Sequence, residues 1–330
     1  MKKFSFPGYK RYHNFGSHLK KKFGEKVFKI CIDAGFTCPN RDGSKGRGGC
    51  IYCNNDSFKP DNIESRQSVS HQLSEGIFYQ KKRYHAHKFI AYFQPFSNTY
   101  GETSLLRELY EEALSNPDVV GLAIGTRPDC VTDETLELFE ELAQKTYLWV
   151  EYGLQSMHDK TLDVINRGHT LKEFHDTFSK TRLIKDINIC VHVIHGLPFE
   201  TKEMMLNTIK YLAQLKIDGI KIHQLHVVRQ TIMAKMYERG EFTIPTLNEY
   251  LDLLTESLEL LPPEVIVQRL FGLGPTELLI APDWDLSKGE FNTTIDRHLD
   301  KVAIYQGDKF TEENHTFFQE NSSILTPSYK

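Results

Sequence analysis

The sequence predicts an α/β fold, a partial (β/α)6 barrel followed by a smaller C-terminal region. Short β-rich runs alternate with longer amphipathic helical patterns up to about residue 235, and this alternation then stops. Alternation of this kind is typical of βαβ units and a parallel sheet. In such sheets ligands bind at the carboxyl ends of the strands. We therefore look for chemistry in the loops that follow the expected strands.

Six runs are expected to form the strands. Each is rich in Val, Ile, Phe or Tyr and is bounded by Gly, Pro, Asp or Asn, which is typical of buried strands. They are residues 27–33, 88–93, 119–124, 147–153, 188–194 and 219–227.

Amphipathic helices are expected between these strands. The clearest begins at Thr132-Asp133, a plausible N-cap, and places Leu136, Phe139 and Leu142 on one face. We divide the chain into a basic arm (1–26), the barrel (27–235) and the C-terminal region (236–330). The other expected helices lie near 70–84, 104–115, 171–184, 202–216 and 246–261.

The composition is that of a soluble globular protein, with 25% charged and 40% hydrophobic residues among 330. No apolar stretch approaches the length of a membrane span, and the N-terminus lacks the apolar core of a secretory signal, so we expect a cytoplasmic protein. The net charge of −4 hides an asymmetry, because residues 1–29 carry nine Lys or Arg and one acid, Glu25. This arm indicates either a polyanionic partner or a solvated, loosely ordered N-terminus.

Three cysteines directly follow the first expected strand. Cys38, Cys50 and Cys53 lie in a loop of turn-forming residues, and thiolates suit zinc or an iron–sulfur cluster. A [4Fe–4S] cluster held by three cysteines leaves one iron open to an exogenous ligand. A zinc site completed by His13, His18 or another cysteine is the alternative, and a loop of unliganded reactive cysteines is a third reading.

This loop, at the mouth of a parallel partial barrel, resembles that of the radical S-adenosylmethionine (radical SAM) enzymes. Their commonest spacing is C-x3-C-x2-C, whereas eleven residues fill the first gap here. With the phrases AGFTCPNRDG and GGCIYC, this spacing resembles the YhcC/YtqA-type subfamily, whose members are relatives of Elp3. The resemblance implies a [4Fe–4S] cluster, S-adenosylmethionine and a 5′-deoxyadenosyl radical that abstracts hydrogen in an enclosed site. It also implies a small reductant protein such as flavodoxin or ferredoxin.

The segment 151–170 resembles one that contacts S-adenosylmethionine in oxygen-independent coproporphyrinogen oxidases and Elp3-like enzymes. By this resemblance, Arg167 would pair with the methionyl carboxylate, which suits a bidentate guanidinium. Gln155 would bond the nucleoside, and Glu151 would accept from the ribose hydroxyls. The alternative is an ordinary strand-end Gln and a surface Arg.

Further candidates follow other expected strands. His192 stands where the related enzymes carry an Asp, and could bond a ribose, carry a substrate proton or be a core histidine. Gln94 and Asn98 lie where related enzymes bind the methionine amino group, although an ordinary loop is the alternative. The catalytic residue is not identified by the sequence. Its candidates are His192, Cys130, which could also be a buried structural thiol, and His226.

The resemblance implies tRNA as the substrate, read at the anticodon loop. The implied reaction converts 5-carboxymethylaminomethyl(-2-thio)uridine at the wobble position to 5-aminomethyl(-2-thio)uridine. Hydrogen loss from the glycyl α-carbon, loss of a further electron and hydrolysis of the imine would release glyoxylate. The arm and the run KKRYHAHK at 81–88 combine cations with aromatic rings, as RNA-loop binders do.

The substrate carboxylate would need a cation, for which Arg41, Arg47 and Arg127 are candidates. Two alternatives stay open. One is a radical enzyme that acts on a small-molecule metabolite or tetrapyrrole, and the other is a non-catalytic zinc or iron–sulfur protein.

Overall fold

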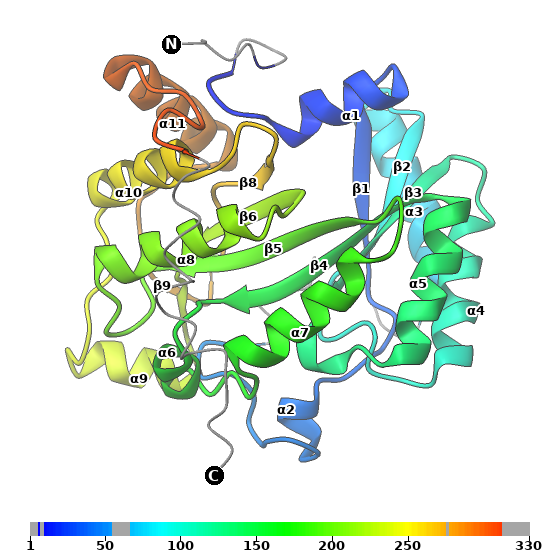
Figure 1. The fold of residues 1–330 in the computed structure, drawn as a ribbon, viewed down its shortest axis with the longest axis horizontal. Coiled ribbons are helices and arrows are strands. Elements are labelled where there is room, and N and C mark those ends of the chain that lie inside the picture. Colours follow the sequence, from blue (N-terminus) through cyan, green and yellow to red (C-terminus); the bar gives the residue numbers. More distant parts are fainter. Residues whose placement is uncertain (1–5, 7–9, 55–66, 275–276, 312–330) are drawn as a thin grey trace.

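The computed structural model describes residues 6, 10–54, 67–274 and 277–311. Its centre is a curled, fully parallel sheet of seven strands in the order β1-β2-β3-β4-β5-β6-β8 (Figure 1). This confirms the expected α/β partial barrel. The strands are β1 (Val27–Ile32), β2 (Lys88–Phe93), β3 (Val119–Thr126), β4 (Tyr147–Gln155), β5 (Asn188–His195), β6 (Gly219–Gln224) and β8 (Ile266–Arg269).

The seventh strand was not expected from the sequence. It pairs in parallel with β6, so an apolar run from the C-terminal region completes the sheet. The run at 219–227 is also divided, because it supplies both β6 and the short β7 (Val227–Val228). Strand β7 pairs antiparallel with β9 (Leu279–Ala281) in a separate two-stranded sheet.

The expected helices are all present, within one or two residues at each end. Thr132 caps α5, since its side chain accepts from the backbone N–H of Thr135. These helices are α3 (Val69–Tyr84), α4 (Thr103–Leu114), α5 (Asp133–Lys145), α7 (Leu171–Arg182), α8 (Lys202–Gln214) and α10 (Leu247–Leu260). Beyond them lie α1 (Phe15–Phe23), α2 (Pro39–Asp42), α6 (Asp159–Val164), α9 (Ile232–Glu238), α11 (Lys288–Val302) and the single turn η3 (Pro128–Cys130).

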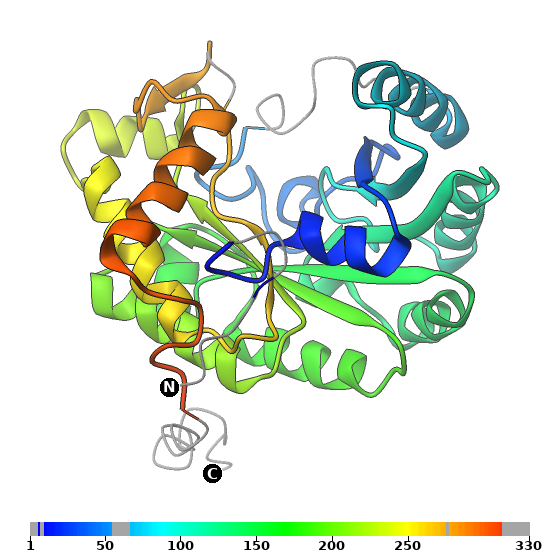
Figure 2. The same cartoon turned by 90° about the horizontal axis from the view of Figure 1, so that it is seen from above.

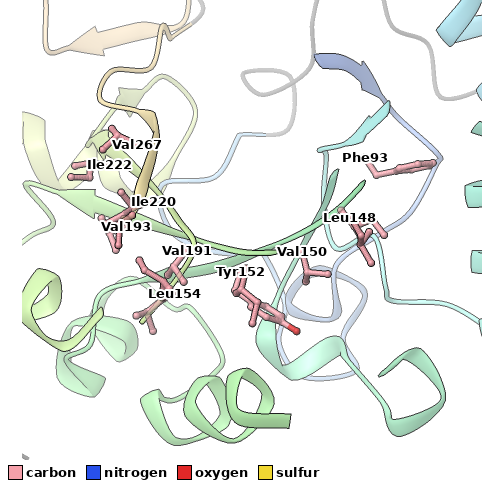
Figure 3. Packing of buried hydrophobic residues seen from close by; sticks show 14 of the residues in the cluster. Phe93, Leu148, Val150, Tyr152, Leu154, Val191, Val193, Ile220, Ile222 and Val267 are labelled. Carbon is pink, nitrogen blue, oxygen red and sulfur yellow. The ribbon is translucent and has the colours of Figure 1, made fainter. Parts of the chain in front are cut away.

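The main hydrophobic core lies between the sheet and its helices. Figure 3 shows Val150, Tyr152, Val191 and Val193 in this core, alternate residues of β4 and β5. Because successive side chains of a strand point to opposite faces, the residues between them point into the curl of the sheet. That inner face carries the polar residues of the molecule's cavity.

The N-terminal segment brings the two edge strands together. Val267 of β8 donates its N–H to the carbonyl of His13 (2.8 Å), and Lys29 Nζ of β1 donates to Gln268 Oε1 (2.8 Å). Helix α1 lies over the strands (Figure 2) and buries Leu19 against Trp149 and its neighbours. Residues 15–23 of the arm therefore form a packed helix, while Lys2 and Lys3 lie outside the described residues. Within the parts of the chain described above, no helix has the length and apolar character needed to cross a bilayer.

Candidate active site

A cavity of about 490 Å³ opens at the carboxyl ends of the strands, a volume typical of ligand pockets. It brings together residues that lie far apart in the sequence. Asn98 and Cys130 are not among its lining residues. The predicted site residues that line the cavity are Cys38, Cys50, Cys53, Gln94, Glu151, Gln155, Arg167, His192 and His226.

The cysteine loop follows β1 and is held by backbone and side-chain donors. Cys38 precedes α2 as its N-cap, and the N–H of Cys53 donates to the carbonyl of Cys50 (2.9 Å). Arg167 Nη1 lies 3.7 Å from Cys50 Sγ, and Arg127 Nη1 lies 4.0 Å from Cys38 Sγ. Cationic donors near sulfur favour the thiolate form that binds metal.

These three thiols fit an iron–sulfur cluster. Across the described residues, no three His, Cys, Asp or Glu side chains are grouped as ligands of one metal ion. The cysteines of a four-iron cluster need not be close enough to share one ion, because each thiolate binds its own iron. Cys38, Cys50 and Cys53 around one shared cavity, with cations beside their sulfurs, match that requirement.

Arg167 combines deep burial with an unused donor. Its side chain donates from Nη2 to the carbonyl of Gly153 (2.7 Å), and its residue is only 7% exposed. The Nε atom is buried without a hydrogen-bond partner in the described structure. Buried polar groups are normally paired, so an unpaired guanidinium N–H beside a cavity indicates an anionic ligand. The predicted contact with a methionyl carboxylate would use this donor.

The end of β4 has an unusual backbone. Its register with β5 shifts between Gly153 and Gln155, and Gln155 has a φ of 74°. Positive φ is costly for a residue other than glycine, and such residues cluster at functional sites. Gly153 has no room for a side chain, since a Cβ would lie 2.8 Å from both Arg167 Nη2 and Gln155 Nε2. Arg167 and Gln155, both predicted to bind the cofactor, therefore lie beside Gly153, where a larger residue would displace them.

Glu151 is the centre of a buried ionic network. Its carboxylate accepts from Lys29 Nζ (2.5 Å), from Lys221 Nζ, and from His192 Nε2 (2.8 Å). Burial opposes ionisation, but the two lysines and His192 hold the pKa of Glu151 well below its usual range. Burial lowers the pKa of Lys221 to about 7 and that of His192 to about 4. Glu151 and His192, both predicted to bind cofactor, thus bind each other.

Lys29 and Lys221 are not among the residues predicted from the sequence. A usable signal exists, because each is the only Lys or Arg of its strand, at a position that alternation places on the inner face. Lys221 is level with His192 in the sheet. A charged residue at such a position needs a buried partner, and Glu151 of β4 is that partner.

The loop after β2 and the turn after β3 are built on Asn98 and Arg127. Asn98 donates to the carbonyls of Phe93, Pro95 and Gly125 (2.8–3.1 Å). The Asn98 Oδ1 atom is buried without a hydrogen-bond partner among the described residues, and the contact of Asn98 with the methionine amino group stays a prediction. Gln94, by contrast, lines the cavity and accepts from the thiol of Cys31 (3.2 Å).

Arg127 fixes the neighbouring arginine. Its Nε and Nη2 donate to the Asp129 carboxylate (2.9 and 2.8 Å), and its Nη1 donates to the carbonyl of Arg167 (2.7 Å). Burial acts against ionisation, but Arg127 and Lys45 lower the pKa of Asp129 to about 2. Arg127 thus bridges the Asp129 carboxylate and the backbone of Arg167.

The remaining catalytic candidates, Cys130 and His226, differ in whether they line the cavity. Cys130 is buried in η3, where burial raises its pKa to about 11, as expected of a structural thiol. His226 lines the cavity, and its Nε2 pairs with the Gln224 amide (2.9 Å). Burial lowers the pKa of His226 to about 4, so its ring is neutral near pH 7.

The two basic segments predicted from the sequence meet in space. Lys88 Nζ donates to the carbonyl of Phe23 at the end of α1 (2.9 Å), and Phe28 stacks on Tyr84 at the end of α3. They form a surface at the amino ends of β1 and β2, whereas the cysteine loop follows the carboxyl end of β1 (Figure 1). A six-residue strand, about 20 Å long, separates the two. The exposed cations without an acidic partner among the described residues, here called the basic surface, are Lys20, Lys21, Lys22, Lys26, Lys82 and Arg83.

Comparison with known proteins identifies the family. The model of the radical SAM superfamily matches residues 38–212, and that of the Radical_SAM C-terminal domain matches residues 217–301. Uncharacterized protein YtqA of Bacillus subtilis is 41% identical over 304 residues, which cover 91% of this chain and 93% of YtqA. Protein YhcC of Escherichia coli is 39% identical over 293 residues, covering 88% and 93%.

More distant relatives match part of the chain. The tRNA uridine(34) acetyltransferase of Methanocaldococcus jannaschii is 28% identical over 190 residues, which cover 56% of this chain and 34% of that protein. The solved structure of archaeal Methanocaldococcus infernus Elp3, with an N-terminal deletion, has a TM-score of 0.65 at 18% identity. It covers 85% of this chain and 64% of that one, and supports the fold. The chain belongs to the radical SAM superfamily, whose members use a [4Fe–4S] cluster and S-adenosylmethionine.

Proposed function

We propose that this protein modifies tRNA, converting 5-carboxymethylaminomethyl(-2-thio)uridine at the wobble position to 5-aminomethyl(-2-thio)uridine. The observation that carries the substrate is the similarity to tRNA uridine(34) acetyltransferase, a protein whose name specifies the wobble uridine. That similarity spans 190 residues and 56% of this chain.

The residues that line the cavity would have different roles in this reaction. Cys38, Cys50 and Cys53 would hold the cluster, while Arg167 and Gln155 would hold S-adenosylmethionine. When bound, these groups supply a 5′-deoxyadenosyl radical that takes a hydrogen atom from a C–H bond. Arg127 keeps Arg167 in place through its backbone carbonyl, and the walls of the cavity shield a reactive substrate from water.

The basic surface supports a polyanionic substrate. It lies about one strand length from the cavity, so it would contact phosphates of the anticodon stem while the unstacked wobble base enters the cavity. Lys20, Lys21 and Lys82 are exposed and have no acidic partner among the residues described. They are therefore available to phosphate.

The test is a mass-spectrometric profile of tRNA nucleosides from three strains. One lacks this protein and has no second route to the product, one is complemented with wild type, and one with Cys50→Ala. We expect 5-carboxymethylaminomethyl(-2-thio)uridine to accumulate in the first and third strains and to be cleared in the second. Identical profiles would reject the wobble uridine as substrate and direct the search to metabolites or tetrapyrroles. A flavodoxin or ferredoxin is the proposed electron donor.

A further inference from the structure

The wall of the cavity carries an excess of positive charge. Among the lining side chains other than the three cysteines, five are cationic, Arg41, Arg127, Arg167, Arg269 and Lys288, and one is a carboxylate, Glu151. The carboxylate is already shared by Lys29, Lys221 and His192. A cavity of this kind attracts anions, because low-dielectric walls strengthen the field of its fixed charges.

Three of these five cations have partners near the cysteine loop. Arg127 is paired with Asp129, and Arg41 Nη2 donates to the carbonyl of Cys53 (2.9 Å). Arg167 donates to Gly153 and faces the sulfur of Cys50. Arg47, another cation named from the sequence, is not among the lining residues.

Arg269 and Lys288 are different. In the described chain neither side chain has a hydrogen-bond or ion-pair partner, yet both line the cavity. Arg269 ends β8, and Lys288 begins α11. The pKa of Lys288 is lowered, first by desolvation of its amine and second by the charge of Arg269, so the two cations are close to each other. Two neighbouring cations without an acid repel one another, and a bound anion would relieve that repulsion.

The pair and the cysteine loop belong to different edges of the sheet. The loop follows β1 and Arg269 ends β8, the opposite edges of the sheet, and residues of both line one cavity. Arg167, with its free Nε beside the cysteine loop, is placed for the carboxylate of S-adenosylmethionine. Arg269 and Lys288 are thus available for a second carboxylate.

We propose that Arg269 and Lys288 form the subsite that binds the carboxylate of the substrate. This inference rests on the proposed function, in which that group is the carboxymethyl carboxylate of the wobble uridine. The subsite would hold the carboxylate at the β8 side of the cavity, and so place the neighbouring C–H bond between it and the cysteine loop. It would also distinguish substrate from product, because the product has lost this carboxylate.

The experiment measures binding without turnover. Cluster-reconstituted protein with S-adenosylmethionine, but no reductant, is titrated with two anticodon stem-loop RNAs. One carries 5-carboxymethylaminomethyluridine and the other 5-aminomethyluridine. A charged hydrogen bond contributes enough for wild type to prefer the first RNA by about tenfold or more. We expect Arg269→Gln and Lys288→Gln to lose this preference and Arg269→Lys to keep part of it.

Matched controls lie on the same helix as Lys288. Arg297→Gln and Lys301→Gln remove the same charges at exposed positions of α11 that do not line the cavity, and should bind like wild type. Lys288 is itself exposed, so Lys288→Gln should fold even if Arg269→Gln does not. Circular dichroism checks the fold of every variant.

The possible outcomes separate the two proposals. If wild type discriminates but folded Arg269→Gln and Lys288→Gln do so equally well, the subsite is wrong and the proposed function stands. If Arg269→Gln instead weakens S-adenosylmethionine binding and leaves the RNA preference intact, the carboxylate is the cofactor's, and the assignment is overturned. If wild type itself binds both RNAs equally, the wobble-uridine substrate and this subsite are rejected together.

Discussion

Replacing Glu151 by Gln should strongly destabilise the protein. The Glu151 side chain is 0% exposed, and it compensates Lys221, which is 4% exposed. A neutral amide would leave the buried ammonium groups uncompensated, and breaking a buried ion pair in this way costs about 3–5 kcal/mol. For 330 residues the entropy of unfolding is about 0.7 kcal/mol/K. The expected fall in Tm is therefore about 4–7 °C.

The assay is thermal unfolding of wild type and Glu151→Gln, followed by circular dichroism. The control is Glu137→Gln, which removes an exposed carboxylate from α5 and should change Tm by less than about 1 °C. Adding Lys221→Met to Glu151→Gln should recover part of the loss, because it removes one uncompensated charge. A Tm for Glu151→Gln within 1 °C of wild type would refute the reasoning.

The effect should also depend on pH. The pKa of Lys221 is about 7 in the folded protein and would fall further in Glu151→Gln, since the carboxylate is a cause that raises it. Above that pKa the lysine is neutral and needs no counter-charge. The destabilisation should consequently be smaller at pH 8.5 than at pH 6, and equal destabilisation at the two values would show that Lys221 is not the group responsible.

Three further predictions concern other parts of the chain. Gly153→Ala places a Cβ 2.8 Å from Arg167 Nη2 and should weaken S-adenosylmethionine binding by about tenfold in calorimetry, with no change expected if Arg167 is not a ligand. The pKa of Asp129 is about 2, below its usual value of 3.8, so it should contribute about 2 kcal/mol that is present above pH 4 and lost as the pH falls through 2. Asp129→Asn should flatten this acid-side slope in urea unfolding. Lys21→Gln with Lys82→Gln should weaken tRNA binding and lower its salt slope by about one to two, unlike a double substitution of exposed lysines elsewhere.

The strands and helices of the barrel could be predicted because their signals are local. Runs of β-branched and aromatic residues, and a cap such as Thr132, depend on neighbours within a few positions. Strand β8 could not be predicted in this way. Its four residues become a strand only by pairing with β6, more than forty positions earlier in the chain.

The residues of the candidate site also differ in whether a local sequence motif predicts them. The cysteine loop and the segment with Gln155 and Arg167 are contiguous motifs, and both line the cavity as expected. The Glu151 network joins side chains from β1, β4, β5 and β6, so its partners are set by the register of the sheet. Glu151 and His192 were therefore assigned to a cofactor without knowledge of the lysines that face them.

The sequence by itself determined the family of this protein, its alternating elements and its cysteine loop, because each depends on residue order over short spans. Only the tertiary structure decided which charges are satisfied and which remain available. Arg127 is committed to Asp129, whereas Arg269 and Lys288 face the cavity without a partner in the described structure. The physical reason is that electrostatic compensation depends on distance and burial in space, and curling the sheet brings its two edge strands around one cavity.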